Sequence, residues 1–343
     1  MEQRKETKMM RLAEEITFGV EIETTLPHGT CDIGGYHRGC QIVGLPEGWN
    51  AQYDSSIHTT RPGYQGVEIV SPILKGVDGL EQIVTVCNWL QANNAHPNRS
   101  CGLHVHVGWP HEDLPRLRNL INLVANYEEA LFGVTGTPWR KFEGHYASPI
   151  KDKVKRNKFQ LKGGTIRETR FSWQRTGTGP RRIGDDLHSV MQYRNDYICQ
   201  RYQSLNINNL LGGNRQTVEF RCFAGTTSAA KIIGYVQMCL ALVQMAENAK
   251  KAPRVEFKAQ ANSNPDTNAG FGGMKVRDIN NKPAEFNINR FFYYAGWFKN
   301  RNATSGIIED SPITKKEMMK ELRRLATQYD ARLRENYSHT MAS

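Results

Sequence analysis

Alternating apolar and polar side chains predict five short β-strands along this chain. The clearest run covers residues 15–24, where the sequence EITFGVEIET alternates in the manner of a strand with one buried face. Four further segments are short and rich in β-branched or aromatic residues, and they cover residues 66–70, 103–107, 204–207 and 217–223. All five segments are therefore interpreted as strands of one sheet-forming region.

Apolar residues at helical spacing predict four helices, over residues 78–93, 113–132, 228–249 and 314–337. Thr314 stands three residues before Glu317, which is the spacing of a capping box at a helix start. Asp78 precedes Glu81 at the same spacing, in an acidic variant of that signal. The last helix has one apolar stripe, and we interpret it as a packing helix of the same domain rather than as a dimerisation helix.

The order of these elements favours an α+β fold with a mainly antiparallel sheet. Strands and helices are mixed without the regular strand–helix–strand repetition of a doubly wound fold. The pattern breaks between about residues 140 and 186, a glycine-containing segment that we interpret as an insertion or lid. We expect a core over residues 1–250 that carries this insertion, and a C-terminal extension over residues 251–343 whose terminal helix packs on the core.

Ionisable side chains stand in pairs on three of the predicted strands. Side chains two residues apart share one face of a strand, and the residue between them faces the other way. The intervening residues, Ile22, Val105 and Phe220, are apolar and are expected to face the core. For a single pair, the simplest interpretation is a polar face in contact with water. Three such strands favour convergence instead, and the residues concerned are Glu21, Glu23, His104, His106, Glu219 and Arg221.

If these strands lie side by side, their carboxylates need cations to balance them. Oxygen ligands suit Mg²⁺ or Mn²⁺, and an imidazole is compatible with such a site, more so with Mn²⁺. Glu68 lies in a fourth strand, and Asp54 can add another oxygen. Arg221 shares a face with Glu219, which favours a site that handles phosphate near a metal because a guanidinium binds phosphoryl oxygens in bidentate fashion.

The positive charge of the chain is concentrated in one segment. The 343 residues carry a formal net charge of +11, with 45 Lys and Arg against 34 Asp and Glu. Residues 140–182 contain 13 Lys and Arg and 3 Asp and Glu, so 13 − 3 = +10 of the charge lies there. A localised positive field suits phosphate-bearing or acidic partners, although a solvated loop without a specific partner has the same composition.

Cysteine usage and hydropathy indicate a soluble, cytoplasmic protein. No long apolar segment suitable for a membrane span and no apolar leader are evident in the sequence. Seven cysteines at irregular spacings, without a CxxC pair, are typical of reduced intracellular usage. A zinc site formed by Cys31, His37 and Cys40 is a further option, but neither short-spaced ligand pair of such sites is present.

Six segments, taken together and in this order, resemble the carboxylate–amine ligase superfamily, which includes glutamine synthetase and glutamate–cysteine ligase. Within it, the resemblance is closest to the family of putative amidoligases, and it spans about residues 16–245. The segments are FGVEIE at 18–23, DSS at 54–56, EIVSP at 68–72, CGLHVHVG at 101–108, RYQSLN at 201–206 and TVEFRCFAGT at 217–226. The basic segment 140–182 and the chain after about residue 250 do not match the family pattern.

The resemblance implies a glutamine-synthetase-like catalytic core, in which a curved antiparallel sheet forms an active-site funnel for ATP and divalent metal, with helices on its outer face. It implies two or more Mg²⁺ or Mn²⁺ ions. It assigns metal contacts to Glu21, Glu23, Asp54, Glu68, His104 and Glu219. It places His106, Arg221 and Arg201 near the nucleotide, and it makes Arg221 and Glu21 the expected catalytic residues.

The activity that the resemblance implies is ATP-dependent formation of an amide or isopeptide bond through an acyl phosphate. A carboxylate and an amine would be the substrates, and the acceptor can be a peptide or can be linked to a nucleic acid. Two alternatives remain open at this point. One is a metal-dependent hydrolase that uses the strand with His104 and His106. The other is a nucleic-acid-binding protein that uses the basic and aromatic segment 140–182.

Overall fold

The structure is a computed structural model, and it describes residues 11–151, 201–212, 215–249, 282–298 and 306–336. Within these residues an open sheet of eight strands packs against helices, and every strand pair is antiparallel. This confirms the predicted α+β class and the antiparallel sheet. Most of the basic segment, residues 152–182, lies outside the described residues.

The sheet brings together strands that are far apart in sequence. Its order is β2-β3-β4-β1-β6-β8-β7, and β5 also pairs with β1. The long strand β1 therefore lies between β4 and β6, and β8 lies on the other side of β6. The strands are β1 Thr17–Pro27, β2 Cys40–Gln41, β3 Asn50–Gln52, β4 Tyr64–Val70, β5 Leu74–Lys75, β6 Gly102–Gly108, β7 Leu205–Asn206 and β8 Thr217–Ala224.

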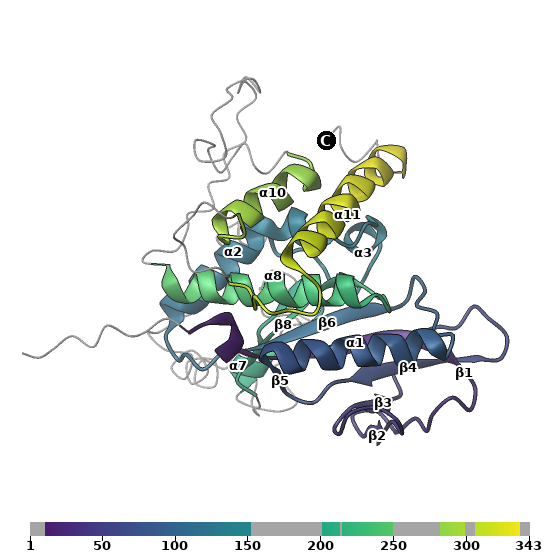
Figure 1. Cartoon of the computed structure of the whole chain (residues 1–343). Coiled ribbons are helices and arrows are strands. Elements are labelled where there is room, and N and C mark those ends of the chain that lie inside the picture. The colour runs from purple at the N-terminus through teal and green to yellow at the C-terminus, as the bar shows by residue number, and fades with distance from the viewer. Residues whose placement is uncertain (1–10, 152–200, 213–214, 250–281, 299–305, 337–343) are drawn as a thin grey trace, which may run out of the picture.

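Helices cover one side of the sheet in two layers. Figure 1 shows α1 and α8 lying along the sheet, with α10 and α11 on the far side of α8. Helix α8 contacts α1, α2, α11 and β6, and α10 contacts α2 and α11. The α-helices of the described residues are α1 Gly76–Ala92, α2 Leu114–Gly133, α3 Trp139–Phe142, α7 Asn208–Gly212, α8 Ala229–Asn248, α10 Ala284–Tyr294 and α11 Lys315–Asn336. A short 3-10 helix spans Ala13–Glu15.

All five predicted strands and all four predicted helices are present, with ends shifted by a few residues. The capping box of α11 is confirmed, since Thr314 and Glu317 exchange hydrogen bonds between each backbone N–H and the other's side chain. The predicted start of α1 at Asp78 is wrong. The helix begins at Gly76, in the left-handed region at φ 58°, and Lys75 precedes it without a side-chain cap.

Three strands and three short or isolated helices were missed by the sequence analysis. Strands β2, β3 and β5 have only two or three residues each, which is too short for a periodic pattern to emerge. Helices α3 and α7 have four and five residues. Helix α10 has eleven residues and buries Phe291 and Phe292, but it lies in a part of the chain that the sequence analysis left unassigned.

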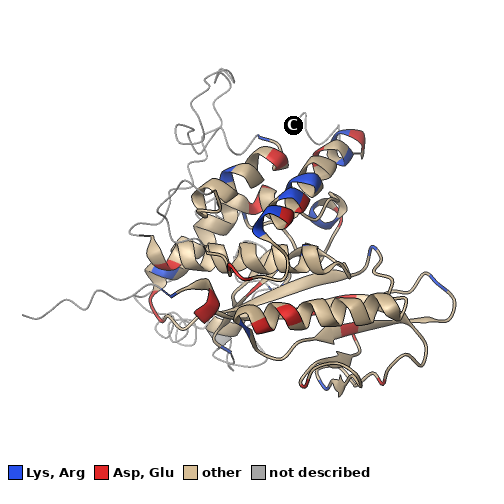
Figure 2. Ribbon diagram, viewed as in Figure 1, with Lys and Arg blue, Asp and Glu red and all other residues tan. Residues whose placement is uncertain are grey.

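Helix α8 passes a length and composition test for a membrane-spanning segment, but it is a core helix. Within its most apolar window, 78% of the helix is buried inside the fold. In Figure 2 most of α8 is free of charged residues, whereas α11 alternates between blue and red along its exposed side. The apolar stripe of α11 packs against α8 and α2, as expected of a packing helix, and it consists of Met318, Leu322, Leu325 and Tyr329.

The apolar face of the sheet is fully covered, as the pattern predicted. Ile22, Val105 and Phe220 have no exposed surface and belong to the main hydrophobic core. Since side chains alternate along a strand, this packing fixes the ionisable residues between them on the opposite face. The hydrophobic core thus determines where the polar cluster lies.

Candidate metal centre and adjoining cavity

The register of four strands places the ionisable pairs side by side on one face of the sheet. Glu21 of β1 lies opposite His104 of β6, and Glu23 of β1 lies opposite Glu68 of β4. On the next pair of strands, His106 of β6 lies opposite Glu219 of β8. The convergence that the sequence pattern favoured is therefore present. We call these side chains, together with Arg221, the acidic cluster.

Most of the acidic cluster is buried, and the side chains of Glu21 and His106 are only 22% and 16% exposed, so the simple interpretation of a polar sheet face in contact with water is wrong. Glu23, Glu68, His104 and Glu219 are each at most 5% exposed, and Arg221 is 7% exposed. Burying several like charges without partners is strongly unfavourable. The cluster therefore needs cations or protons, and its four carboxylates make it a candidate metal site.

His104 lies between two groups of carboxylates. Its Nδ1 is 2.9 Å from Glu21 Oε2 and 3.7 Å from Glu219 Oε1. Its Nε2 is 3.4 Å from Glu23 Oε1, and this buried atom has no hydrogen-bond partner. A buried ring nitrogen without a partner, facing a carboxylate, is an atom available to a metal ion.

Two sets of ligand atoms lie close enough together to hold a metal ion each. The first set is Glu21, His104 and Glu219, and the second is Glu23, Glu68 and His104; within each set the ligand atoms lie within 4.8 Å of one another. The donor chemistry, mostly carboxylate oxygen with one imidazole, fits Mg²⁺ or Mn²⁺. In the part of the chain that the structure describes, Cys31, His37 and Cys40 do not form such a set.

Neutral donors hold three of the carboxylates in place. Gln52 Nε2 donates to Glu68 Oε2 at 2.5 Å, and Asn206 Nδ2 donates to Glu219 Oε2 at 2.6 Å. The backbone N–H of Gly102 donates to Glu23 Oε2 at 2.5 Å. Such bonds orient metal-binding carboxylates. The other oxygen of Glu219 is in an ion pair with Arg221. The sequence analysis missed Gln52 and Asn206, although Asn206 lies in one of the six motif segments.

Two buried arginines, Arg221 of the acidic cluster and Arg140, lie next to each other at this site. Arg221 forms an ion pair with Glu219 through its Nη1 and donates from Nε to the carbonyl of Tyr146 at 3.2 Å. Arg140 of α3 donates from Nη2 to the backbone carbonyl of Arg221 at 3.1 Å, and it is only 2% exposed. Its guanidinium packs directly on Gly102, where any side chain would collide with it. Although Arg140 opens the basic segment, it is a core residue and not part of a basic surface.

Asp54 and Arg201 lie outside the two sets of ligand atoms. Asp54 follows β3, and its Oδ1 accepts a hydrogen bond from the Ser56 N–H at 2.7 Å. Arg201 donates from Nη2 to the Tyr36 hydroxyl at 2.9 Å. Their assignments as metal ligand and nucleotide contact stay predictions.

Comparison with models of protein families assigns this chain to a family. A family model described as a putative amidoligase enzyme matches residues 14–243, which is about two thirds of the chain and contains the whole acidic cluster. The chain belongs to this amidoligase family. No curated protein matches the chain at a significant level. The family resemblance found in the six motif segments is thereby confirmed, and the description of the family supports an enzyme of the ligase class.

The surroundings of the acidic cluster shift the pKa values of three of its side chains. Burial and the neighbouring Glu21 carboxylate raise the pKa of Glu68 from 4.5 to about 8. Burial alone would lower the pKa of His106, but the carboxylates of Glu21 and Glu219 raise it to about 9. Burial would raise the pKa of Glu21, yet the bonds to His106 and His104 hold it well below its ordinary value. At neutral pH the metal-free cluster therefore keeps protons on Glu68 and His106.

A cavity of about 770 Å³ adjoins the acidic cluster of this amidoligase at the Glu21 and His106 end. Its size is within the range of sites for small molecules and cofactors. Trp109 Nε1 and Thr217 Oγ1 are buried at its wall without hydrogen-bond partners. Other residues that line it are Val70, Pro72, Ile73, Pro110, Arg11 and Arg215. The cavity thus combines apolar walls with unused polar groups, and one candidate metal ligand, Glu21, lines it.

Metal affinity is expected to rise with pH between 6 and 8. A divalent ion binds the carboxylate form of Glu68, but this side chain has a pKa of about 8 and is protonated below that pH. Binding must then displace the proton, and affinity falls by up to about tenfold for each pH unit below 8. Calorimetric titration with Mn²⁺ at pH 6, 7 and 8, in buffers of different ionisation enthalpy, measures both affinity and released protons.

The Glu68→Gln variant provides the control for this measurement. It cannot release the proton, so its affinity for Mn²⁺ should be weaker overall and should vary less with pH than that of the unmodified protein. An affinity of the unmodified protein that stays constant from pH 6 to 8 would contradict the place given to Glu68.

Proposed function

We propose that this amidoligase family member is an ATP-dependent carboxylate–amine ligase, which forms an amide or isopeptide bond through an acyl-phosphate intermediate. The observation that carries the proposal is the acidic cluster itself. Two sets of carboxylate ligands, most of them buried, share His104, and Arg221 lies in ion-pair contact with Glu219. This combination suits transfer of a phosphoryl group between two anions.

The residues of the acidic cluster fit two divalent ions, which we propose to be Mg²⁺ or Mn²⁺. Glu21 and Glu219 would hold one ion, and Glu23 and Glu68, with the unpartnered Nε2 of His104, would hold the other. When bound, the ions screen the negative charge of the phosphates and of the substrate carboxylate and align the two for transfer. The chain contributes fixed ligand positions, because Gln52 and Asn206 already hold the second oxygens of Glu68 and Glu219.

The cavity beside Glu21 and His106 is the place that we propose for the nucleotide. Its volume of about 770 Å³ is large enough for a nucleoside triphosphate, and Glu21, a ligand of the first metal set, lines it. Trp109, Pro72 and Ile73 give apolar walls for the base, and protonated His106 faces the phosphate end.

Arg221 would act on the phosphoryl group as charge builds up in the transition state. One carboxylate oxygen of the substrate attacks the γ-phosphorus, the bond to the bridging oxygen of ADP breaks, and ADP leaves with the electron pair. The planar guanidinium is held in place by Glu219 and the Tyr146 carbonyl, so it is oriented before the reaction begins. Glu21 would be the second catalytic residue, as the cluster carboxylate nearest to the nucleotide cavity.

In the second half of the reaction an amine attacks the acyl carbon. The carbon–nitrogen bond forms, the bond to phosphate breaks, and the amine gives up one proton. The burial of the cluster favours this step because it limits the access of water, which would otherwise hydrolyse the acyl phosphate. The substrates are a carboxylate and an amine in the cytoplasm, and a peptide or a nucleic-acid-linked acceptor suits the basic composition of the chain.

Trapping with hydroxylamine tests the proposed reaction directly. The protein is incubated with ATP, Mn²⁺, hydroxylamine and a panel of amino acids and peptides whose carboxylates carry ¹⁸O. We expect ADP, a hydroxamate and ¹⁸O in the released phosphate, because the carboxylate oxygen passes to phosphorus. AMP and pyrophosphate would indicate adenylation instead. ATP turnover that never depends on any carboxylate would overturn the ligase proposal.

The metal-dependent hydrolase is less well supported than the ligase. That alternative uses His104 and His106 together as ligands, but both sets of ligand atoms contain His104, and neither contains His106. His106 instead contacts Glu21, with 3.0 Å between Nε2 and Oε1. A nucleic-acid-binding role for the basic segment concerns residues that lie mostly outside those the structure describes.

Arg215 is expected to contribute to nucleotide binding, although the sequence analysis did not select it. It is exposed, it lines the cavity, and within the described residues no carboxylate pairs with it. Arg215→Gln should weaken ATP binding by about three- to tenfold, the usual range for losing one exposed charge contact to phosphate. Arg38→Gln, at an exposed position that does not line the cavity, is the matched control. Calorimetry with ATP and Mn²⁺ measures the effect, and unchanged affinity would place the nucleotide elsewhere.

A further inference from the structure

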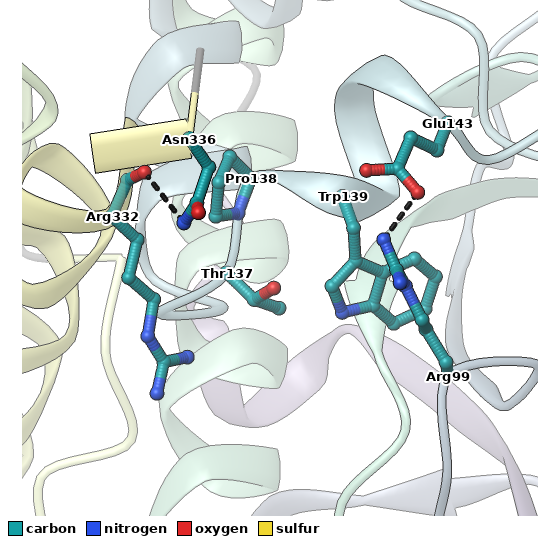
Figure 3. A pocket seen from close by; sticks show the side chains of 7 residues that line it. All are labelled: Arg99, Thr137, Pro138, Trp139, Glu143, Arg332 and Asn336. Carbon is teal, nitrogen blue, oxygen red and sulfur yellow. Dashed lines mark hydrogen bonds and ion pairs between the residues drawn. The ribbon is translucent and has the colours of Figure 1, made fainter. Parts of the chain in front are cut away.

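A second cavity lies on the outside of the fold, where α3 meets the end of α11. Its volume is about 420 Å³, and its lining comes from α3, α11, the turn before α3 and the loop before β6. Figure 3 shows Arg332 and Asn336 on one side of the gap and Trp139, Glu143 and Arg99 on the other. None of these residues belongs to the acidic cluster or lines the proposed nucleotide cavity, so this second cavity is separate from both.

The polar groups of this cavity suit an anion. Arg332 donates from Nη1 to the carbonyl of Gly136 at 2.9 Å, which fixes the direction of its guanidinium. Within the described part of the chain, no carboxylate pairs with Arg332, so its charge is not neutralised by the protein. Arg99 is paired with Glu143, and both side chains are largely exposed, at 65% and 45%. Such an exposed ion pair is weak and can exchange partners with a ligand.

Trp139 adds an aromatic surface to the same cavity. The side chain is half-buried and lines the gap next to Arg99. Tryptophan is the aromatic residue that best supports stacking of a planar ring, and its ring resists disorder because it has few rotatable bonds. The cavity therefore combines a stacking surface with an unpaired guanidinium, which together match a planar ring that carries one anionic group.

The cavity is also connected to the acidic cluster through one short helix. Trp139 and Arg140 are neighbours in α3, so one side chain lines the outer cavity while the other enters the core. Arg140 donates to the Arg221 carbonyl and packs on Gly102, whose N–H holds Glu23. A ligand that contacts Trp139 would therefore touch the helix that supports Arg221 and Glu23.

We propose that the cavity between α3 and α11 is a second binding site, for a small planar aromatic anion, distinct from the catalytic centre. A nucleoside monophosphate and an aromatic amino acid with a free carboxylate share this chemistry. The ring stacks on Trp139, and the anionic group pairs with Arg332, with Arg99 as a second cation once Glu143 is released. The proposal does not depend on the proposed ligase activity, because it rests on residues outside that site.

Calorimetric titration in the presence of EDTA tests the second site without metal-dependent binding at the acidic cluster. The probes are AMP, N-acetyltyrosine, adenosine and inorganic phosphate. We expect AMP or N-acetyltyrosine to bind at least about tenfold more tightly than adenosine or phosphate, because only the former two use both the ring and the charge. AMP as the tighter of the two assigns a nucleotide, and N-acetyltyrosine as the tighter assigns an aromatic carboxylate.

Variants separate this site from the catalytic one. Arg332→Gln and Trp139→Leu should each weaken binding about tenfold or more. Trp139→Phe should retain most of the affinity, because an aromatic ring remains at this position. Arg334→Gln, an exposed arginine on the same helix, and Arg215→Gln should leave it unchanged. Millimolar or weaker binding of both AMP and N-acetyltyrosine would overturn the proposal. The proposal would also be overturned if Arg215→Gln abolished binding and Arg332→Gln did not, because the probe would then occupy the nucleotide cavity.

Discussion

Glu219→Gln is expected to abolish metal-dependent ATP binding and turnover while the fold survives. Glu219 has one oxygen near His104 and Arg221 and the other bonded to Asn206, so it is the best-positioned ligand of the first metal set. A carboxamide has the same shape but no charge, and it binds divalent cations poorly. We expect the Mn²⁺ affinity of that set and the ATP turnover to fall by at least about 100-fold.

Two control measurements distinguish the loss of a metal ligand from a general loss of folding. Thermal unfolding in EDTA should show that Glu219→Gln remains folded, since glutamine keeps the size of glutamate and its one amide oxygen can still accept from Arg221, although the bond from Asn206 is lost. Glu81→Gln, an exposed position on α1, provides a matched change outside the cluster and should retain the metal affinity and turnover of the unmodified protein. If Glu219→Gln also retains both, the acidic cluster is not the metal centre, and the ligase proposal fails with it.

Arg221→Lys is expected to reduce turnover far more than it reduces ATP binding. The guanidinium of Arg221 contacts Glu219 and the Tyr146 carbonyl at the same time, with its Nη1 and Nε. A lysine ammonium is a point charge and cannot reproduce this planar, two-sided arrangement. If Arg221 stabilises charge that develops during phosphoryl transfer, kcat should fall by about 100- to 1,000-fold, while the Kd for ATP changes by less than about tenfold.

The comparison of kcat with Kd distinguishes catalysis from binding at this position. Equal losses in the two constants would indicate that Arg221 binds the ground state and does not act on the transition state. Arg140→Lys changes the neighbouring buried arginine and serves as a comparison variant, because Arg140 contacts the backbone of Arg221 and not its side chain. Thermal unfolding of both variants identifies any loss that comes only from a destabilised core.

Local patterns predicted the strands because strand geometry repeats every two residues. In FGVEIE the alternation places Ile22 in the core and Glu21 and Glu23 on the other face, and the structure confirms it. The same argument holds for Val105 and for Phe220. By contrast, β2, β3 and β5 are too short to show a period, and they exist because neighbouring strands offer them backbone hydrogen-bond partners.

The sequence pattern could not predict whether the ionisable side chains of the site are buried. A pair such as Glu219 and Arg221 gives the same sequence pattern whether its side chains face water or other parts of the protein. The decision depends on what covers the polar face, and here the segment near Tyr146 and strand β7 approach it. Those contacts join residues that are about 75 and 13 positions apart in the chain, and no local periodicity encodes them.

The sequence by itself determined the family, the α+β class and the identity of the ionisable pairs, because these depend on residue type and on short-range periodicity. The tertiary structure alone decided which pairs meet: Glu21 with His104, and Glu23 with Glu68. It also decided that Gln52, Asn206 and the buried Arg140 support them. The physical reason is that strand register and burial follow from packing of the whole core, which joins segments far apart in the chain.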